Sequence, residues 1–377
     1  MKIAVNTRLL LHDKLEGIGW FTFETLKRIT TNHPDVDFYF LFDRKYNEKF
    51  IFGPNVKPVV LFPQARHPFL FVTWFELSVT HALKKIKPDL FLSPDGYLSL
   101  STKFKSLAVI HDLNFEHFPK DLPGLVRVYY KYYFPRFARK ANRIATVSHF
   151  SKEDIVNQYN IAASKVDVIY NGVNEKFMPV LESEIQVVRK KYTDGKSYFL
   201  FVGSLHPRKN LIRLFKAFDI FRDSSAHDIK LLVVGEKKWW TSEMESTFEA
   251  MKHQSDVIFS GRLNLEDLHL VTASALASTY VSYFEGFGIP IIESFRCGVP
   301  VITSNVTSMP EVAGDAAMLI DPFDEASIAD ALLKIADDGN LRKELIDRGF
   351  ERSKYFSWDH TAKQLWESMM KTINDNI

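Results

Sequence analysis

Short apolar runs alternate with longer stretches of mixed polarity along the whole chain. The runs are rich in β-branched and aromatic residues, which predicts buried strands, and the stretches between them have the length of helices. In the first half, the strands expected from this pattern are residues 3–6, 38–42, 59–62, 90–93, 106–110, 143–146 and 166–169. The helices expected between them are residues 19–31, 71–85, 125–141 and 151–159, the last opened by a capping box from Ser151 to Asp154.

A second alternating set follows a turn at Asn171 and Gly172. Its expected strands are residues 197–202, 230–234, 257–259, 277–282 and 299–303, and its expected helices are 210–221, 328–336, 341–355 and 358–373. Two successive sets of this kind predict two Rossmann-like α/β domains, joined near residues 174–179. Sheets of this class bind ligands at the carboxyl ends of their strands.

The composition is that of a soluble globular enzyme, with 46% hydrophobic and 25% charged residues among 377. The single cysteine, Cys297, excludes an internal disulfide framework and fits a reducing compartment. The chain opens on a predicted strand rather than on a signal peptide, and no apolar run approaches the roughly 18 residues that a membrane span needs. We therefore expect a cytoplasmic protein.

The net charge of +2 is unevenly distributed. Residues 1–175 hold 24 Lys and Arg against 17 Asp and Glu, and between Arg127 and Arg136 the basic residues are interleaved with aromatic ones. Two interpretations stay open: peripheral contact of the N-terminal domain with the anionic inner face of a membrane, or an amphipathic helix with solvated bases. A nucleic-acid partner is not expected, because the chain contains no reader motif and its isoelectric point is near 8.3.

Two glutamates, Glu285 and Glu293, stand eight positions apart around a Gly-x-Gly turn. The preceding strand ends before Glu285, and Pro290 suits the first turn of a helix that places Glu293 about one turn further on. Gly286 and Gly288 allow backbone N–H groups to approach an anion at the positive end of that helix. Such a site holds phosphates through amides and sugar hydroxyls through carboxylates. The alternative is a plain strand–turn–helix joint with two solvated glutamates.

The whole run from Glu285 to Thr303 resembles the Glu-x7-Glu signature of the retaining GT-B glycosyltransferases of family 4. The resemblance implies that Glu293 binds the ribose hydroxyls of a nucleotide sugar and that Glu285 lies beside its sugar and diphosphate. The remaining donor contacts that it implies on this segment are the amides of Gly286, Phe287, Gly288 and Ile289.

A second motif runs from Phe201 to Asn210, where a predicted strand leads into a basic turn. In family 4 this turn binds the donor diphosphate, and Lys209 matches the diphosphate lysine. Ser204 stands where many members have an arginine, so a clamp of two cations requires that Arg208 takes its place. A solvated basic turn before a helix is the alternative.

Three further segments resemble the family. His111 ends a buried-type strand at the position that contacts the donor sugar, although a lone histidine also suits a structural role. Gly17 and Gly19 match a glycine loop beside the diphosphate, or form an ordinary turn into a helix. Gly261 and Leu263 fall where members hold the nucleobase through backbone groups.

The resemblance implies a GT-B fold, two Rossmann-like domains facing across a cleft, with a C-terminal helix that crosses back to the first domain. The domains expected are residues 1–175 for the acceptor, 176–356 for the nucleotide-sugar donor, and 357–377 for the returning helix.

The function expected is retaining transfer of a hexose, with His111, Lys209 and Glu285 as the catalytic residues. The acceptor is a glycan or a lipid-linked glycan of polysaccharide or lipopolysaccharide biosynthesis, and GDP-mannose is the favoured donor. We expect neither a cofactor nor a metal, since Asp35 and Asp37 precede a predicted strand instead of following one. Two alternatives stay open: a transferase of the same fold that uses UDP-glucose or UDP-N-acetylglucosamine, and a degenerate sugar-nucleotide-binding scaffold.

Overall fold

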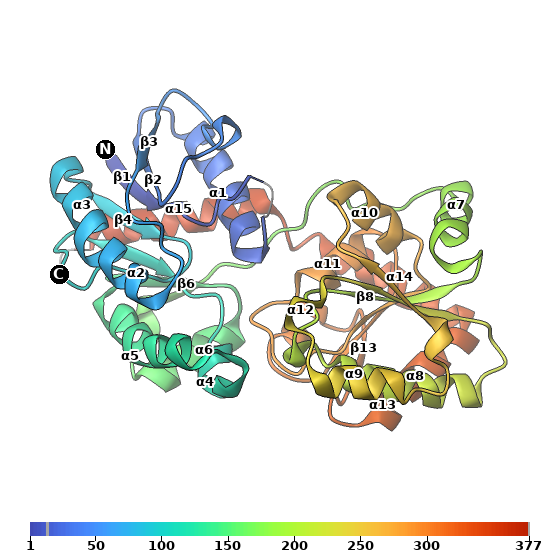
Figure 1. Ribbon diagram of the computed structural model, residues 1–377. Coiled ribbons are helices and arrows are strands. Elements are labelled where there is room, and N and C mark those ends of the chain that lie inside the picture. Colours follow the sequence, from blue (N-terminus) through green and yellow to red (C-terminus); the bar gives the residue numbers. More distant parts are fainter. Residues whose placement is uncertain (13–14, 376–377) are drawn as a thin grey trace. The chain divides into compact units, whose positions relative to one another are not determined.

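The computed structural model describes residues 1–12 and 15–375 and divides into two compact units. Unit 1 comprises residues 1–172 together with the C-terminal segment from Ser357, and unit 2 comprises residues 173–356. Each unit is a parallel sheet covered by helices (Figure 1). The predicted α/β class with two Rossmann-like domains is therefore confirmed.

Unit 1 contains a seven-stranded parallel sheet in the order β3-β2-β1-β4-β5-β6-β7. Its strands are β1 (Lys2–Asn6), β2 (Asp37–Phe42), β3 (Val56–Val60), β4 (Leu90–Ser93), β5 (Ser106–Val109), β6 (Arg143–Thr146) and β7 (Val166–Val168). From β1 the chain adds β2 and β3 on one side of the sheet, and from β4 onward it adds the remaining strands on the other side of β1. The strand order therefore reverses between β1 and β4. Ile3 of β1 pairs with Phe38 on one side and with Leu90 on the other.

Helices cover both faces of the unit 1 sheet because its strands are apolar on both faces. One face packs against α1 (Gly17–Asn32) and α15 (Trp358–Asn374) through Phe21, Leu26 and Leu365. The other packs against the continuous helical run of α2 (Pro68–Thr73), η2 (Trp74–Val79, a π-helix) and α3 (Thr80–Ile86), and against α5 (Gly124–Lys140). The shorter elements are η1 (Glu48–Phe50), α4 (Asn114–His117), η3 (Pro119–Asp121), α6 (His149–Tyr159) and η4 (Ala163–Lys165).

The C-terminal helix α15 returns to unit 1, as predicted. Trp358, Leu365 and Met369 are buried against the sheet, and the Thr361 hydroxyl donates a hydrogen bond of 2.7 Å to the carbonyl of Tyr170. The segment that leaves unit 1 and the segment that returns to it therefore lie side by side. A Cβ added to Gly172 would lie 2.3 Å from the backbone nitrogen of Trp358, so only glycine fits there.

Unit 2 contains a six-stranded parallel sheet in the order β10-β9-β8-β11-β12-β13. The strands are β8 (Tyr198–Val202), β9 (Lys230–Val234), β10 (Val257–Gly261), β11 (Ala277–Tyr280), β12 (Val301–Ser304) and β13 (Met318–Ile320). The helices are α7 (Glu182–Thr193), η5 (Pro207–Lys209), α8 (Leu211–Ser224), η6 (Lys237–Trp239), α9 (Ser242–Glu249), η7 (Gln254–Asp256), α10 (Leu265–Ala273), α11 (Ile289–Arg296), α12 (Met309–Ala313), α13 (Glu325–Asp337) and α14 (Gly339–Ser353). Its core joins the buried strands to α8 and α13 through Phe215, Phe218 and Leu332.

Two local predictions were wrong. The strand expected at 59–62 is β3 at Val56–Val60, which contains Pro58; the sheet tolerates a proline there because β3 is an edge strand. The helix cap expected at Ser151 belongs to Ser148, whose hydroxyl accepts a hydrogen bond of 3.0 Å from the Ser151 backbone N–H.

Within residues 1–12 and 15–375, the structure holds no helix with the length and apolar character of a membrane span.

We expect Gly172→Ala to lower the free energy of unfolding by about 1–3 kcal/mol, the usual cost of overpacking a filled site. Gly124→Ala is the matched control, because a Cβ at Gly124 meets no atom within 4 Å. Urea unfolding of both variants measures the difference. Equal stability of the two variants would show that the backbone at Trp358 can move away from residue 172 without loss of stability.

Candidate functional site

The loops that follow β8 and β11 leave the unit 2 sheet where its strand order reverses. The chain continues from β8 to β9 and β10 on one side, whereas β11 pairs with the other side of β8. Neighbouring loops diverge at such a point, and ligands of open α/β sheets bind in the crevice that results. The β8 loop contains Arg208 and Lys209, and the β11 loop contains Glu285.

The side chains of these two loops meet at one carboxylate. Arg208 Nη1 lies 2.5 Å from Glu285 Oε2, and Lys209 Nζ lies 2.6 Å from Glu285 Oε1. Lys209 Nζ also donates a hydrogen bond of 2.8 Å to the hydroxyl of Tyr280. Lys209 and Glu285 are only 7% and 6% exposed, whereas Arg208 is partly exposed. Two cations thus share one anion, which leaves a net charge of +1 in this group.

The electrostatics keep this group charged. Burial by itself raises the pKa of Glu285, but Arg208 and Lys209 outweigh burial and lower this pKa to about 2. Burial and the same two cations lower the pKa of His206 to about 4, so its imidazole is neutral at neutral pH. His206 Nδ1 accepts a hydrogen bond of 3.3 Å from the Arg208 backbone N–H and so caps η5.

Glycines allow neighbouring backbone segments at this edge of the unit 2 sheet to approach each other closely. A Cβ on Gly235, at the end of β9, would lie 1.9 Å from the carbonyl oxygen of Gly203, at the end of β8. Gly288 has a φ of +110° and immediately precedes α11, a conformation that side chains other than glycine rarely adopt. The N-terminus of α11 therefore opens beside the loop that holds Glu285.

Glu293 lies in the second turn of α11 and is partly buried. Its surroundings raise the pKa of its carboxyl to about 8 through burial. Among residues 1–12 and 15–375, no side chain or backbone group pairs with this carboxyl. A carboxyl of this kind has both oxygens available for hydroxyl groups of a ligand.

A second group of polar side chains lies at the carboxyl edge of the unit 1 sheet. His111 follows β5, and its Nε2 lies 2.9 Å from the carbonyl oxygen of Pro94, which follows β4. The imidazole packs edge-on against Phe21 with ring centroids 5.0 Å apart, and burial lowers its pKa. The backbone carbonyl of His111 accepts a hydrogen bond of 3.2 Å from the hydroxyl of Ser151.

Comparisons with known proteins identify the family of this chain. The family model described as glycosyl transferases group 1 matches residues 183–352, and the model described as glycosyltransferase family 4 matches residues 15–177. O-antigen chain mannosyltransferase B of Escherichia coli is 31% identical over 288 residues, which are 75% of this chain and 74% of that protein. The chain belongs to the group 1, family 4 glycosyltransferases.

A second relative of this glycosyltransferase is the O-antigen chain mannosyltransferase RfbU of Salmonella typhimurium. It is 27% identical over 226 residues, which are 60% of this chain and 59% of RfbU. Among solved structures, sucrose-phosphate synthase of Thermosynechococcus elongatus superposes with a TM-score of 0.79 at 18% identity, covering 97% of both chains. Anabaena HepE in complex with UDP-glucose has a TM-score of 0.74 at 18% identity and covers 98% of this chain and 100% of its own. These two likenesses confirm the GT-B fold.

The structure brings some of the predicted donor residues of this glycosyltransferase together. Arg208, Lys209 and Glu285 meet directly, whereas Ser204 is exposed and makes no side-chain hydrogen bond in the part of the chain that is described. The second cation beside Lys209 is therefore Arg208. Gly261 ends β10 with a φ of +71°, and its carbonyl accepts a hydrogen bond of 3.0 Å from Gly235.

Other predicted residues contribute in different ways. Phe287 is 4% exposed, and its ring packs edge-on against Phe356 with ring centroids 5.6 Å apart, so its side chain belongs to the core of unit 2. Gly286 is buried in the same loop, whereas Ile289 and Leu263 are partly exposed. In unit 1, Gly17 is the first residue of α1 and Gly19 packs within that helix, where a Cβ would lie 3.0 Å from the carbonyl oxygen of Leu9.

Several residues that shape this site were not predicted from the sequence. Tyr280 binds Lys209, and the Ser308 hydroxyl donates hydrogen bonds of 2.8 and 3.0 Å to the carbonyls of Glu285 and Phe287. Asn210 donates from its side chain to the carbonyl of Val281, at 3.0 Å. Each of the three lies at the end of a strand or in the loop after it, and this position was the only available signal.

The elevated pKa of Glu293 predicts a pH-dependent stability. A glutamate in the unfolded chain has a pKa near 4.3. Between about pH 4 and pH 8, the folded protein therefore holds a proton on Glu293 that the unfolded chain has lost. The free energy of unfolding consequently falls as the pH rises through this range. We expect Glu293→Gln to remove this decrease, so that the variant gains stability over wild type as pH rises toward 8. Urea unfolding of wild type and variant at several pH values measures the difference in stability. Glu249→Gln, a change at an exposed glutamate, is the control. A difference that stays constant with pH would contradict the assignment.

Proposed function

We propose that this glycosyltransferase is a retaining enzyme that transfers mannose from a nucleotide diphosphate sugar to a glycan or lipid-linked acceptor of polysaccharide biosynthesis. The observation that carries the proposal is the group of Arg208, Lys209 and Glu285 at the strand reversal of unit 2. Its net positive charge fits a ligand that carries more than one negative charge.

In this proposal, Arg208 and Lys209 both bind the diphosphate of the donor. As the glycosidic bond breaks, negative charge develops on the leaving diphosphate, and fixed cations that meet this charge lower the barrier. Lys209 is held by Glu285 and Tyr280, so it is oriented before the donor arrives. The N-terminus of α11, which follows Gly288, adds backbone N–H groups and the positive end of a helix dipole.

Glu293 and His111 are assigned to the sugars of the donor. The carboxyl of Glu293 has both oxygens available, which suits the two hydroxyls of a ribose. His111 has its Nε2 bound to a carbonyl, and a carbonyl only accepts, so Nε2 carries the proton and Nδ1 is an acceptor. We assign Nδ1 to a hydroxyl of the transferred hexose.

Retention follows from same-face attack in this proposal. Glu285 is the carboxylate nearest the two cations, and a pKa of about 2 makes it a weak nucleophile. The acceptor hydroxyl therefore attacks on the face that the diphosphate leaves, and a diphosphate oxygen accepts its proton. Arg208 and Lys209 supply the charge that a metal supplies in other transferases, so we expect activity to persist in excess chelator.

Mannose is the favoured sugar because the two curated relatives are named mannosyltransferases. GDP-mannose is then the favoured donor. A donor of the UDP-glucose type is the second candidate, because HepE is described in complex with UDP-glucose. A tenfold tighter binding of UDP than of GDP, about 1.4 kcal/mol, would favour the second donor. A chain without donor turnover would instead be a sugar-nucleotide-binding scaffold.

The donor site is tested by Lys209→Ala. Loss of one preorganised cation at the leaving group should lower kcat by about two to three decades, which corresponds to about 2.7–4 kcal/mol. Lys216→Ala is the control, since Lys216 is an exposed lysine of the same unit. Turnover of GDP-mannose by both variants is the measurement. Wild-type turnover in Lys209→Ala would refute the role of this lysine.

We also propose a cytoplasmic enzyme that lies on the anionic inner face of a membrane through α5. This helix contains five basic residues and no acidic one. Tyr129, Phe134 and Phe137 turn into the core, which agrees with the amphipathic interpretation, but Leu125 and Val128 are 79% and 65% exposed on another face. Exposed apolar residues flanked by bases fit a membrane with anionic lipids.

Vesicle sedimentation tests this surface. Leu125→Ser combined with Val128→Ser should reduce binding to vesicles that contain anionic lipid, because apolar burial and charge both contribute to binding there. Leu181→Ser, a change at a residue that is 71% exposed in unit 2, is the control. Unchanged binding of the double variant, or equal binding of wild type to neutral vesicles, would contradict the proposal.

A further inference from the structure

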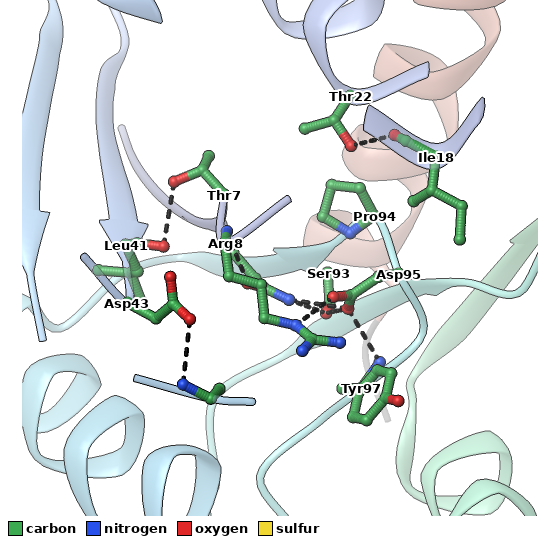
Figure 2. Close-up of polar contacts among 12 residues, drawn as sticks. Thr7, Arg8, Ile18, Thr22, Leu41, Asp43, Ser93, Pro94, Asp95 and Tyr97 are labelled. Carbon is green, nitrogen blue, oxygen red and sulfur yellow. Dashed lines mark hydrogen bonds and ion pairs between the residues drawn. The ribbon is translucent and has the colours of Figure 1, made fainter. Parts of the chain in front are cut away.

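The strand order of unit 1 also reverses, and a buried ion pair lies at this point. Arg8 follows β1 and Asp95 follows β4, the two strands between which the order changes. Arg8 Nε lies 2.6 Å from Asp95 Oδ2, and the side chains are 8% and 4% exposed. Figure 2 shows the Arg8 side chain reaching toward Asp95 and Ser93, with Tyr97 close by.

Asp95 is held from several directions. Asn6 Nδ2 donates to Asp95 Oδ1 at 2.8 Å, and the Ser93 hydroxyl donates to the same oxygen at 3.1 Å. The Tyr97 backbone N–H donates to Oδ1 at 3.3 Å. These bonds and the ion pair with Arg8 leave the carboxylate one orientation (Figure 2).

Aromatic rings fix the other partner of the pair. The Arg8 guanidinium carbon lies 4.3 Å from the ring centroid of Tyr97, 5.0 Å from that of Phe71 and 5.8 Å from that of Phe75. Burial opposes the charge on Arg8, but Asp95 and Tyr97 outweigh it and raise the arginine pKa. A buried ion pair adds little stability over apolar packing of the same volume, so its geometry offers a better explanation than its energy.

The geometry leads from Asp95 to His111. Asp95 shares a peptide unit with Pro94, and the carbonyl oxygen of this unit lies 2.9 Å from His111 Nε2. The bonds to the Asp95 side chain restrain the Cα of Asp95, and with it the peptide unit whose carbonyl points at the imidazole. Gly96, with a φ of +81°, continues the turn, and a Cβ there would lie 3.2 Å from the carbonyl oxygen of Val109 on β5.

We propose that Asp95 and Arg8 are positioning residues that hold His111 as its Nε2–H tautomer, with Nδ1 directed to the substrate as an acceptor. The inference rests on the proposed function, in which His111 accepts a hydrogen bond from the transferred hexose. Within the described residues, no group hydrogen-bonds to Nδ1, so this lone pair is available to a hydroxyl.

Nitrogen-15 NMR of histidine-labelled, ligand-free protein tests the link. Long-range proton–nitrogen correlations distinguish a protonated ring nitrogen from a bare one, and loss of a signal set in His111→Gln assigns His111 among the 12 histidines. We expect the Nε2–H pattern in wild type and a mixture of both tautomers in Asp95→Asn. Arg8→Lys is the second variant, for use if Asp95→Asn does not fold. It retains the charge but loses the Nε contact to Asp95, and we expect it to show the same mixture of tautomers.

Asp43→Asn is the matched control. Asp43 is a buried aspartate that follows β2, pairs with Arg44 at 2.7 Å and accepts a hydrogen bond from the Ala65 backbone N–H; in the described part of the chain, no hydrogen bond or ion pair joins it to Pro94. It should leave the His111 pattern unchanged. An unaltered tautomer in both Asp95→Asn and Arg8→Lys, or an equal mixture in Asp43→Asn, would overturn the proposal.

Kinetics separate positioning from a general loss of structure. A misplaced His111 should lower kcat by about tenfold to a hundredfold in Asp95→Asn while the donor KM stays within about threefold. Unchanged kcat in a variant with a mixed tautomer would overturn the catalytic part of the inference. Unchanged turnover in His111→Gln would instead refute the proposed role of His111, whereas the NMR result tests the Asp95 link without substrate.

Discussion

The carboxylate that Arg208 and Lys209 share is the interaction on which the proposed donor site depends. Glu285, Lys209 and Tyr280 are almost fully buried, and charges in such a place persist only when each has a partner. Glu285 orients both cations toward one point, and the three charged side chains together carry a net charge of +1. A diphosphate that binds there meets a site already arranged, which is the condition for electrostatic stabilisation of a leaving group.

The same topological rule places the chemistry of both units. In unit 2, the reversal between β8 and β11 brings a basic loop next to an acidic one; in unit 1, the reversal between β1 and β4 brings Arg8 next to Asp95. These groups are far apart in sequence but adjacent in space, because the carboxyl ends of parallel strands share one edge of a sheet. Glycines complete the arrangement, since Gly203 and Gly235 let the backbones of two strand ends approach more closely than any side chain allows.

Much of this architecture could be predicted from the sequence. Strand periodicity placed β1, β4 and β6 almost to the residue, and the Glu-x7-Glu run placed Glu285 in a loop and Glu293 in a helix. The pattern failed where local signals conflict, as at Pro58, or where two serines compete for one helix cap, as at Ser148 and Ser151.

The contacts within the site could not be predicted, because they depend on distances between loops. The sequence offers Arg208 as a substitute for the arginine missing at Ser204, but only the structure shows that its side chain meets Glu285, and nothing local in the sequence indicates that Tyr280 binds Lys209. The Arg8–Asp95 pair is a stronger example, since its two residues are 87 positions apart and neither belongs to a motif. Only the register of β1 and β4 brings them together.

The proposed donor site depends most directly on the binding of the donor diphosphate by Arg208 and Lys209. Calorimetric titration with a nucleoside diphosphate and with the corresponding nucleoside, in wild type and in Arg208→Ala, isolates this contact from that of the base and ribose. With both cations on the diphosphate, wild type should bind the diphosphate far more tightly than the nucleoside. Arg208→Ala should lose about tenfold or more of this preference, as expected for a charged hydrogen bond of about 1.5–3 kcal/mol. An unchanged preference in the variant would contradict the binding of the diphosphate by Arg208.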